Sequence, residues 1–261
     1  MTTPDFLTTI RDESARFRAA LAECPDRPVP TCPDWSTDDL LWHLAEVQWF
    51  WGTIVSENVS EPDGLQHPQR PEGRDATLAA FDDASRALQE TLRNTPADEG
   101  RWMWTVDESL HTAGYILRRQ AHEALIHRVD AELTAGVDVS AVDADLAADG
   151  IDEVVDVMYG RDHPLVTFAP AQGRVVELVA TDADRRWVLQ LGRETASIDG
   201  EEIDDANFRP APNATVTATI SGTAADLDLW LWNRPTHGDL ARSGDQATLA
   251  AMDEVLAEGM Q

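Results

Sequence analysis

The sequence predicts an α+β protein, in which an N-terminal antiparallel four-helix bundle is followed by a small α+β domain. Three observations support this. Four segments between residues 5 and 135 place apolar side chains at helical spacing. Several runs after residue 160 alternate apolar and polar side chains, as half-buried strands do. The two patterns are segregated along the chain, which favours α+β over alternating strands and helices. We therefore expect a bundle over residues 1–140 and a second domain over 141–261.

A proline-rich connector separates the first two predicted helices. Residues 5–23 have the apolar spacing of a helix. Residues 24–35 contain four prolines, which cannot continue a helix, so an extended connector is expected. Ser36 followed three residues later by Asp39 has the pattern of a capping box. This pattern predicts a second helix over 37–57.

Two more helices complete the predicted bundle. A loop over 58–73, rich in proline, glycine and glutamate, precedes a third helix over about 75–93. The short apolar run 101–105 separates that helix from a fourth over about 110–135. Gly136 suits the C-cap of the fourth helix, because glycine readily adopts the left-handed conformation that often ends a helix.

The second half of the chain has a different pattern. One amphipathic helix over 144–159 is followed by strand-like runs with one polar face. The expected elements are strands at 165–168, 175–180, 187–191 and 214–220, a Trp-rich helix at 223–232 and a last helix at about 245–258.

The charge of the chain excludes several functions. It has 20 basic and 48 acidic residues, a formal net charge of -28, and every basic residue is arginine. Without lysine there is no Schiff-base lysine and no phosphate-loop lysine. A chain with this much negative charge repels nucleic acid and anionic membranes. Neither is therefore expected as a partner. The acidic excess has two interpretations, which are solubility in an arginine-favouring composition and adaptation to salt.

Other features point to a cytoplasmic protein. No apolar run approaches the ~20 residues of a membrane span, and the first residues lack the basic and apolar regions of a signal peptide. The two cysteines, Cys24 and Cys32, are too few for a disulfide framework or a zinc ribbon. The sequence does not indicate an oligomeric state.

The fourth predicted helix carries a candidate metal site. Glu123 and His127 are four residues apart, so both side chains reach one point beside the helix. A carboxylate and an imidazole there suit a divalent transition metal. His43, on the apolar stripe of the second helix, is a candidate third ligand, or alternatively a core histidine with no ligand role. Two histidines and one glutamate form a known catalytic zinc set with one open position.

The face that carries the pair is unusually polar for a bundle. A polar stripe inside a bundle is costly unless it binds something. The alternative is that the helix is rotated and the stripe faces water. The stripe consists of Ile116, Gln120, Glu123, His127 and Asp130.

Three longer motifs can be compared with known families. They are Val29–Leu44 (VPTCPDWSTDDLLWHL), Arg119–Glu132 (RQAHEALIHRVDAE) and Gly222–Arg234 (GTAADLDLWLWNR). The first two, and more loosely the third, resemble the mycothiol-dependent maleylpyruvate isomerase-like family. The resemblance covers nearly the whole chain. It implies a DinB/YfiT-like four-helix bundle with a small α+β C-terminal domain. It also implies that His43, Glu123 and His127 bind zinc or a similar divalent ion, and that mycothiol is the thiol co-substrate.

The resemblance implies an enzyme that activates mycothiol as a thiolate and isomerises maleylpyruvate from cis to trans. The substrate is a small anionic electrophile, so an arginine is needed against the negative charge of the chain. Arg234 is the candidate catalytic arginine, with a surface arginine at a helix end as the alternative, and Arg119 is the candidate on the cofactor side. The alternative functions are a mycothiol S-transferase acting on another electrophile and a non-catalytic metal-binding or sensor protein.

Overall fold

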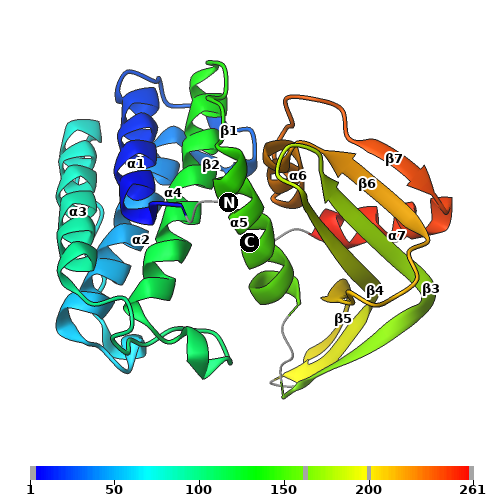
Figure 1. Ribbon diagram of the computed structural model, residues 1–261. Helices are drawn as coiled ribbons and strands as arrows, with labels where there is room; N and C mark the ends of the chain where they lie inside the picture. The colour runs from blue at the N-terminus through cyan, green and yellow to red at the C-terminus, as the bar shows by residue number, and fades with distance from the viewer. Residues whose placement is uncertain (1–3, 161–163, 199–200, 259–261) are drawn as a thin grey trace. The chain divides into compact units, whose positions relative to one another are not determined.

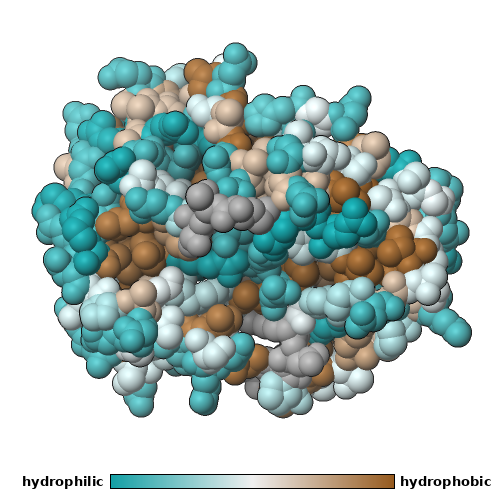
Figure 2. Space-filling model, in the orientation of Figure 1, coloured by the Kyte–Doolittle hydropathy of each residue, from teal (hydrophilic) through white to brown (hydrophobic). Residues whose placement is uncertain are grey.

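The computed structural model describes residues 4–160, 164–198 and 201–258, and the chain divides after Ser140 into two compact units (Figure 1). The first unit is helical and the second contains a sheet, so the predicted α+β class is confirmed. In the view of Figure 2, hydrophilic residues cover most of the visible face and apolar residues form smaller patches, as the net charge of -28 leads one to expect.

The first unit contains the four predicted helices. They are α1 (Phe6–Ala22), α2 (Thr37–Glu57), α3 (Arg74–Asn94) and α4 (Ala113–Ala135). The main packing partners are α1 with α4 and α2 with α3. One core cluster joins all four helices through buried side chains such as Phe17, Leu40, Leu44 and Phe81.

The connections between the helices hold short elements that the sequence pattern did not predict. The proline-rich connector is extended, as expected, but it also forms a small antiparallel hairpin of β1 (Pro28–Val29) and β2 (Cys32–Ser36). Short 3₁₀ turns are η1 (Pro62–Gly64) and η2 (Glu108–Leu110). Helix α4 starts at Ala113 rather than 110, because Thr112 caps it by accepting a hydrogen bond from the Tyr115 N–H at 3.1 Å.

The second unit packs three helices with a five-stranded mixed sheet. Its helices are α5 (Ala144–Glu153), which continues as the π-helical turn η3 (Val154–Tyr159), α6 (Ala224–Leu231) and α7 (Gln246–Glu258). Its strands are β3 (Val166–Ala180), β4 (Arg185–Ile198), β5 (Glu201–Pro210), β6 (Ala218–Gly222) and β7 (Ala241–Gly244), in the order β5-β4-β3-β6-β7. Among the described strands of this sheet, β3 and β6 pair in parallel, and the other neighbouring strands pair antiparallel. The core combines buried side chains such as Ile151, Leu178, Phe208, Leu227 and Met252.

Two of these strands, β5 and β7, were not expected from the sequence. They are the edge strands of the sheet. Three exposed residues of β5, Glu202, Asp204 and Asp205, are acidic, and all four residues of β7 are exposed. An edge strand buries little of its surface, and charged residues at edges prevent pairing with other chains. Such strands therefore lack the apolar alternation from which a strand is predicted.

None of the described helices is long and apolar enough to cross a bilayer.

Candidate metal centre

Local interactions hold the start of helix α2, the helix that carries His43. The Ser36 N–H donates to Asp39 Oδ2 at 2.9 Å, and the Asp39 N–H donates to Ser36 Oγ at 3.2 Å, so the predicted capping box is formed. The hydrogen bonds that the Asp39 carboxylate accepts from the Ser36 N–H and, at 2.7 Å, from the Ser36 hydroxyl lower the pKa of Asp39. An ionised carboxylate at this position is also favoured by the helix dipole.

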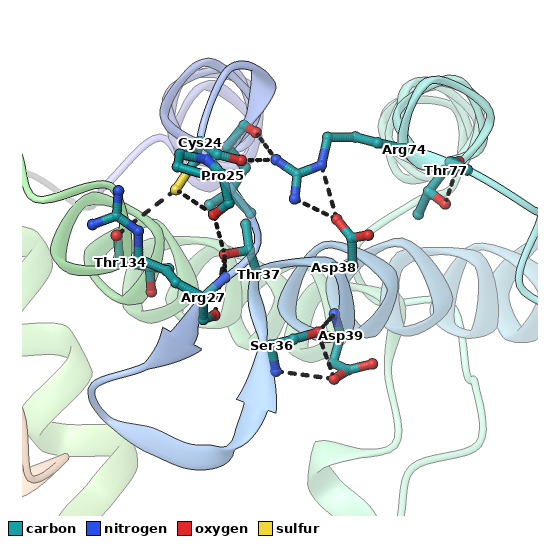
Figure 3. A network of polar contacts seen from close by, with 12 residues as sticks. Cys24, Pro25, Arg27, Ser36, Thr37, Asp38, Asp39, Arg74, Thr77 and Thr134 are labelled. Atoms are coloured by element: carbon teal, nitrogen blue, oxygen red, sulfur yellow. Dashed lines mark hydrogen bonds and ion pairs between the residues drawn. The ribbon is translucent and has the colours of Figure 1, made fainter.

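Helix α3 and the connector hold the same end of α2 (Figure 3). The Arg74 guanidinium donates to Asp38 Oδ1 at 2.8 Å and to the Leu21 carbonyl oxygen at 3.2 Å. The Thr37 hydroxyl donates to the Pro25 carbonyl at 3.1 Å, and its backbone N–H donates to the Arg27 carbonyl at 2.9 Å. The first turn of α2 is thus attached both to the end of α1 and to α3, which sets the direction of the His43 side chain two turns later.

Three side chains from two helices converge on one point. His127 Nε2 lies 3.1 Å from His43 Nε2 and 3.1 Å from Glu123 Oε1, and His43 Nε2 lies 3.7 Å from the same carboxylate oxygen. The structure therefore brings together the two residues paired by helical spacing and the third from the neighbouring helix. Among the described residues, no cysteine, no further histidine and no further acid joins this group.

The spacing of these atoms fits a metal ion. Nitrogen and oxygen ligands lie about 2.0–2.1 Å from zinc, so two tetrahedral ligands are about 3.3 Å apart. The three separations in the site, 3.1, 3.1 and 3.7 Å, bracket that value. The side chains of His43 and Glu123 are 32% and 20% exposed, so the group is open to solvent on one side. Three ligands with one accessible side are typical of catalytic rather than structural zinc sites.

Asp130 orients His127. Its Oδ2 lies 3.1 Å from His127 Nδ1, and its Oδ1 accepts a hydrogen bond from the Thr31 hydroxyl at 2.6 Å. Asp130 is fully buried. A proton on Nδ1 shared with this carboxylate leaves the Nε2 lone pair directed at the site, which is the arrangement found around metal-binding histidines. The sequence places Asp130 three residues after His127 on the same stripe, but spacing alone did not reveal this role.

Arg119 holds the carboxylate of the group. Its Nη2 donates to Glu123 Oε2 at 2.7 Å, and its side chain is only 6% exposed. The other oxygen, Oε1, remains directed at the two imidazoles. Burial is the largest influence on Glu123 and acts to raise its pKa, but the Arg119 charge and the hydrogen bonds from the histidines outweigh it and hold the pKa well below the usual value. Glu123 is thus ionised, as a metal ligand must be.

A metal ion and a proton compete for the Nε2 lone pair of His127. Burial acts to lower its pKa, but the hydrogen bonds and charges of Asp130 and Glu123 outweigh burial and raise the pKa to about 9. Without a metal, the imidazole is therefore protonated near neutral pH. A cation that takes this position displaces that proton, so binding weakens as the pH falls.

The polar stripe of α4 is buried, so the alternative that it faces water is wrong. Gln120 and Asp130 are 1% and 0% exposed, and the opposite face, including Ala121 and Leu125, is buried too. Most residues of this stretch are buried on both faces of the helix, with Glu123 partly exposed, and a single apolar face does not predict this. Trp35, whose ring lies 4.6 Å from that of His43, is a further neighbour that the spacing did not identify.

The remaining candidate residue, Arg234, belongs to the second unit, and the two cysteines belong to the first. Arg234 follows helix α6 in the second unit, where its Nη1 donates to the Trp232 carbonyl at 2.6 Å. Cys24 is buried and its thiol approaches the Thr134 carbonyl at 3.8 Å, whereas Cys32 is half-buried on β2. Neither cysteine forms a disulfide bond.

Replacing Asp130 with alanine is expected to weaken metal binding by about 10–100-fold, because His127 loses the group that fixes its orientation. Competition with a chelator measures this change. The matched control is Asp12→Asn, which alters an exposed carboxylate paired only with Arg11. Equal metal affinity in Asp130→Ala and the unaltered protein would show that Asp130 does not support the site.

Comparison with known proteins gives a consistent result over most of the chain. The family model "Mycothiol maleylpyruvate isomerase N-terminal domain" matches residues 7–132, and the model "MDMPI C-terminal domain" matches residues 145–251. A crystal structure of the mycothiol-dependent maleylpyruvate isomerase has a TM-score of 0.57 at 15% identity, covering 94% of this chain and 95% of that one. A histidine-to-alanine variant of that enzyme has a TM-score of 0.55 at 14% identity, with the same coverage. No curated protein sequence matches.

Proposed function

This chain belongs to the mycothiol maleylpyruvate isomerase family, and from this we propose that it is a metal-dependent enzyme that uses mycothiol to isomerise maleylpyruvate from cis to trans. The observation that carries the proposal is the convergence of His43, Glu123 and His127 at distances that suit a tetrahedral ion. The structural likeness supports the fold on which this site is built.

Each residue of the site has a distinct task in this proposal. His43, Glu123 and His127 would hold zinc or a similar divalent ion, which when bound stabilises a thiolate and so makes a thiol nucleophilic near neutral pH. Arg119 keeps Glu123 ionised and in place through the 2.7 Å hydrogen bond. Asp130 keeps the His127 lone pair directed at the ion.

The proposed reaction is an isomerisation, so the substrate and the product contain the same atoms. The mycothiol sulfur adds to the double bond of maleylpyruvate, and the electron pair of that bond moves to the conjugated carbonyl as an enolate. Rotation about the resulting single bond follows. The enolate then re-forms the double bond in the trans form and expels the thiolate, so the thiol is regenerated.

The substrate is a dianion. We propose Arg234 as the catalytic residue that binds this dianion and Arg119 as a residue that binds the cofactor. Arg234→Ala is expected to raise KM for maleylpyruvate by about 10–100-fold, since a charge-assisted hydrogen bond contributes about 1.5–3 kcal/mol. Metal content should not change. Initial-rate kinetics and elemental analysis measure the two quantities, and an unaltered KM would remove Arg234 from the site.

Neither cysteine of the chain is the nucleophile in this proposal, since no cysteine joins the ligand group among the described residues. A variant carrying both Cys24→Ser and Cys32→Ser is expected to retain mycothiol-dependent turnover within about twofold, because the changes lie outside the proposed chemistry. Circular dichroism confirms that the variant is folded. Loss of turnover in a folded variant would instead indicate a protein thiol as nucleophile.

Product analysis tests the function itself. The purified enzyme is supplied with its metal, mycothiol and maleylpyruvate, and both the trans product and the free thiol are followed over time. An isomerase forms product while the thiol concentration stays constant. Stoichiometric loss of thiol on an electrophile would indicate an S-transferase, and no reaction with any electrophile would indicate a non-catalytic metal-binding protein.

A further inference from the structure

A groove outside the metal centre lies between helices α1 and α3 of the bundle. It has a volume of about 370 Å³ and runs between the facing sides of these helices. On α1 the lining residues recur at intervals of three and four, which is the repeat of one helix face. Small side chains, Ser14 and Ala15 on α1 and Ser85 on α3, leave the space open. None of these residues belongs to the metal centre, which is formed by α2 and α4.

Arginines outnumber acids among the residues that line the groove, although the chain as a whole is strongly anionic. Four arginines and only two acids, Asp82 and Glu90, line it, whereas acids outnumber arginines by more than two to one in the whole sequence. Arg18 pairs with Asp82 at 2.6 Å, Arg11 pairs with Asp12 at 2.8 Å, and Arg86 pairs with Asp83, so these three arginines already have carboxylate partners. Arg93 has no carboxylate partner within the described part of the chain. The lining arginines are Arg11, Arg18, Arg86 and Arg93.

The floor of the groove offers buried hydroxyl groups. Ser14 and Ser85 are 2% and 6% exposed. Ser14 Oγ accepts a hydrogen bond from Gln48 Nε2 at 2.9 Å, and Ser85 Oγ accepts one from Gln89 Nε2 at 3.0 Å. Neither hydroxyl donates to any described residue, and the Oε1 atom of the fully buried Gln48 has no partner there either. A buried hydroxyl that only accepts a hydrogen bond still has its own O–H group, which can donate to a ligand.

We propose that this groove binds a small polyanion, a phosphate ester or a dicarboxylate, through its arginines and the hydroxyls of its floor. Guanidinium groups bind both anions in bidentate geometry. The volume lies within the range of small-molecule sites. Binding here involves neither the metal nor the thiol, so it does not depend on the proposed function.

Titration of the full-length protein with inorganic phosphate and, separately, succinate tests the proposal. We expect saturable binding with a Kd of about 1 mM or tighter for at least one probe, with NMR shifts confined to α1 and α3. The combined change Arg86→Gln and Arg93→Gln should weaken it at least tenfold. Ala15→Glu, at an exposed helical position, should abolish it by placing a carboxylate in the groove.

Two controls separate this site from the metal centre and from general charge. His127→Ala, which disrupts the metal ligand group, should leave binding unchanged. Arg242→Gln removes an exposed arginine of the second unit that pairs with Asp253, and it should also have no effect. A preference for phosphate over succinate would identify a phosphate ester as the ligand class, and the reverse a dicarboxylate. The absence of saturable binding at millimolar concentrations, or binding that survives Ala15→Glu, would overturn the proposal.

Discussion

Replacing His127 with alanine is expected to reduce the metal content of the purified protein from about one ion per chain to background, since a site with three protein ligands does not retain its ion after losing one. His127 is the central member of the group, with its Nε2 3.1 Å from both other ligands. Mycothiol-dependent turnover should fall to the uncatalysed rate. His43→Ala tests the contribution of the second helix and should have the same effect.

Elemental analysis of the variants measures this directly and does not depend on the identity of the substrate. His67→Ala is a suitable control because His67 is exposed, pairs with Glu46 at 2.8 Å and lies outside the ligand group. It should retain the metal. If either ligand variant still carried about one ion per chain, the ligand set inferred here would be incorrect.

Replacing Arg128 with methionine is expected to destabilise the protein by about 3–5 kcal/mol. Arg128 is fully buried between α4 and α1. Its guanidinium donates to Glu13 Oε2 at 2.6 Å, to Glu132 Oε2 at 2.8 Å and to the Ser140 carbonyl at 2.8 Å. Methionine fills much of the same volume, so most of the cost comes from the buried carboxylates. Glu132 loses its cation, and Glu13 keeps only the half-exposed Arg16, at 3.1 Å.

Urea denaturation measures the change in the free energy of unfolding. Arg11→Met removes an arginine from an exposed pair with Asp12, and it should change stability by less than about 1 kcal/mol. Adding Glu13→Leu and Glu132→Leu to Arg128→Met removes the stranded charges and should recover much of the loss. A loss below about 1 kcal/mol in Arg128→Met alone would show that water solvates these carboxylates.

Local patterns were sufficient to identify the helices and the residues that meet in the candidate site. The capping box at Ser36 and the glycine after α4 predicted helix ends that the structure contains. Helical spacing placed Glu123 and His127 on one side of α4, and the apolar stripe of α2 placed His43 toward the bundle. The strands at the sheet edges were missed, because an exposed edge requires no apolar alternation.

The residues around the ligand group could not be predicted in the same way. Helical spacing shows that Asp130 and Arg119 lie near the pair, but not that one binds His127 Nδ1 and the other Glu123 Oε2. Those roles depend on side-chain direction, and in the case of Asp130 on the Thr31 hydroxyl, which comes from the β1–β2 hairpin almost 100 residues earlier.

The sequence by itself determined the class of the fold, the phase of the helices and the chemical nature of the three converging groups, since each depends on residues a few positions apart. Only the tertiary structure decided that both the polar and the apolar face of α4 are largely buried, that a buried carboxylate orients His127, and that four arginines line one groove on two helices. Burial and electrostatic environment depend on which distant segments pack together. A periodic pattern within one segment contains no information about its neighbours.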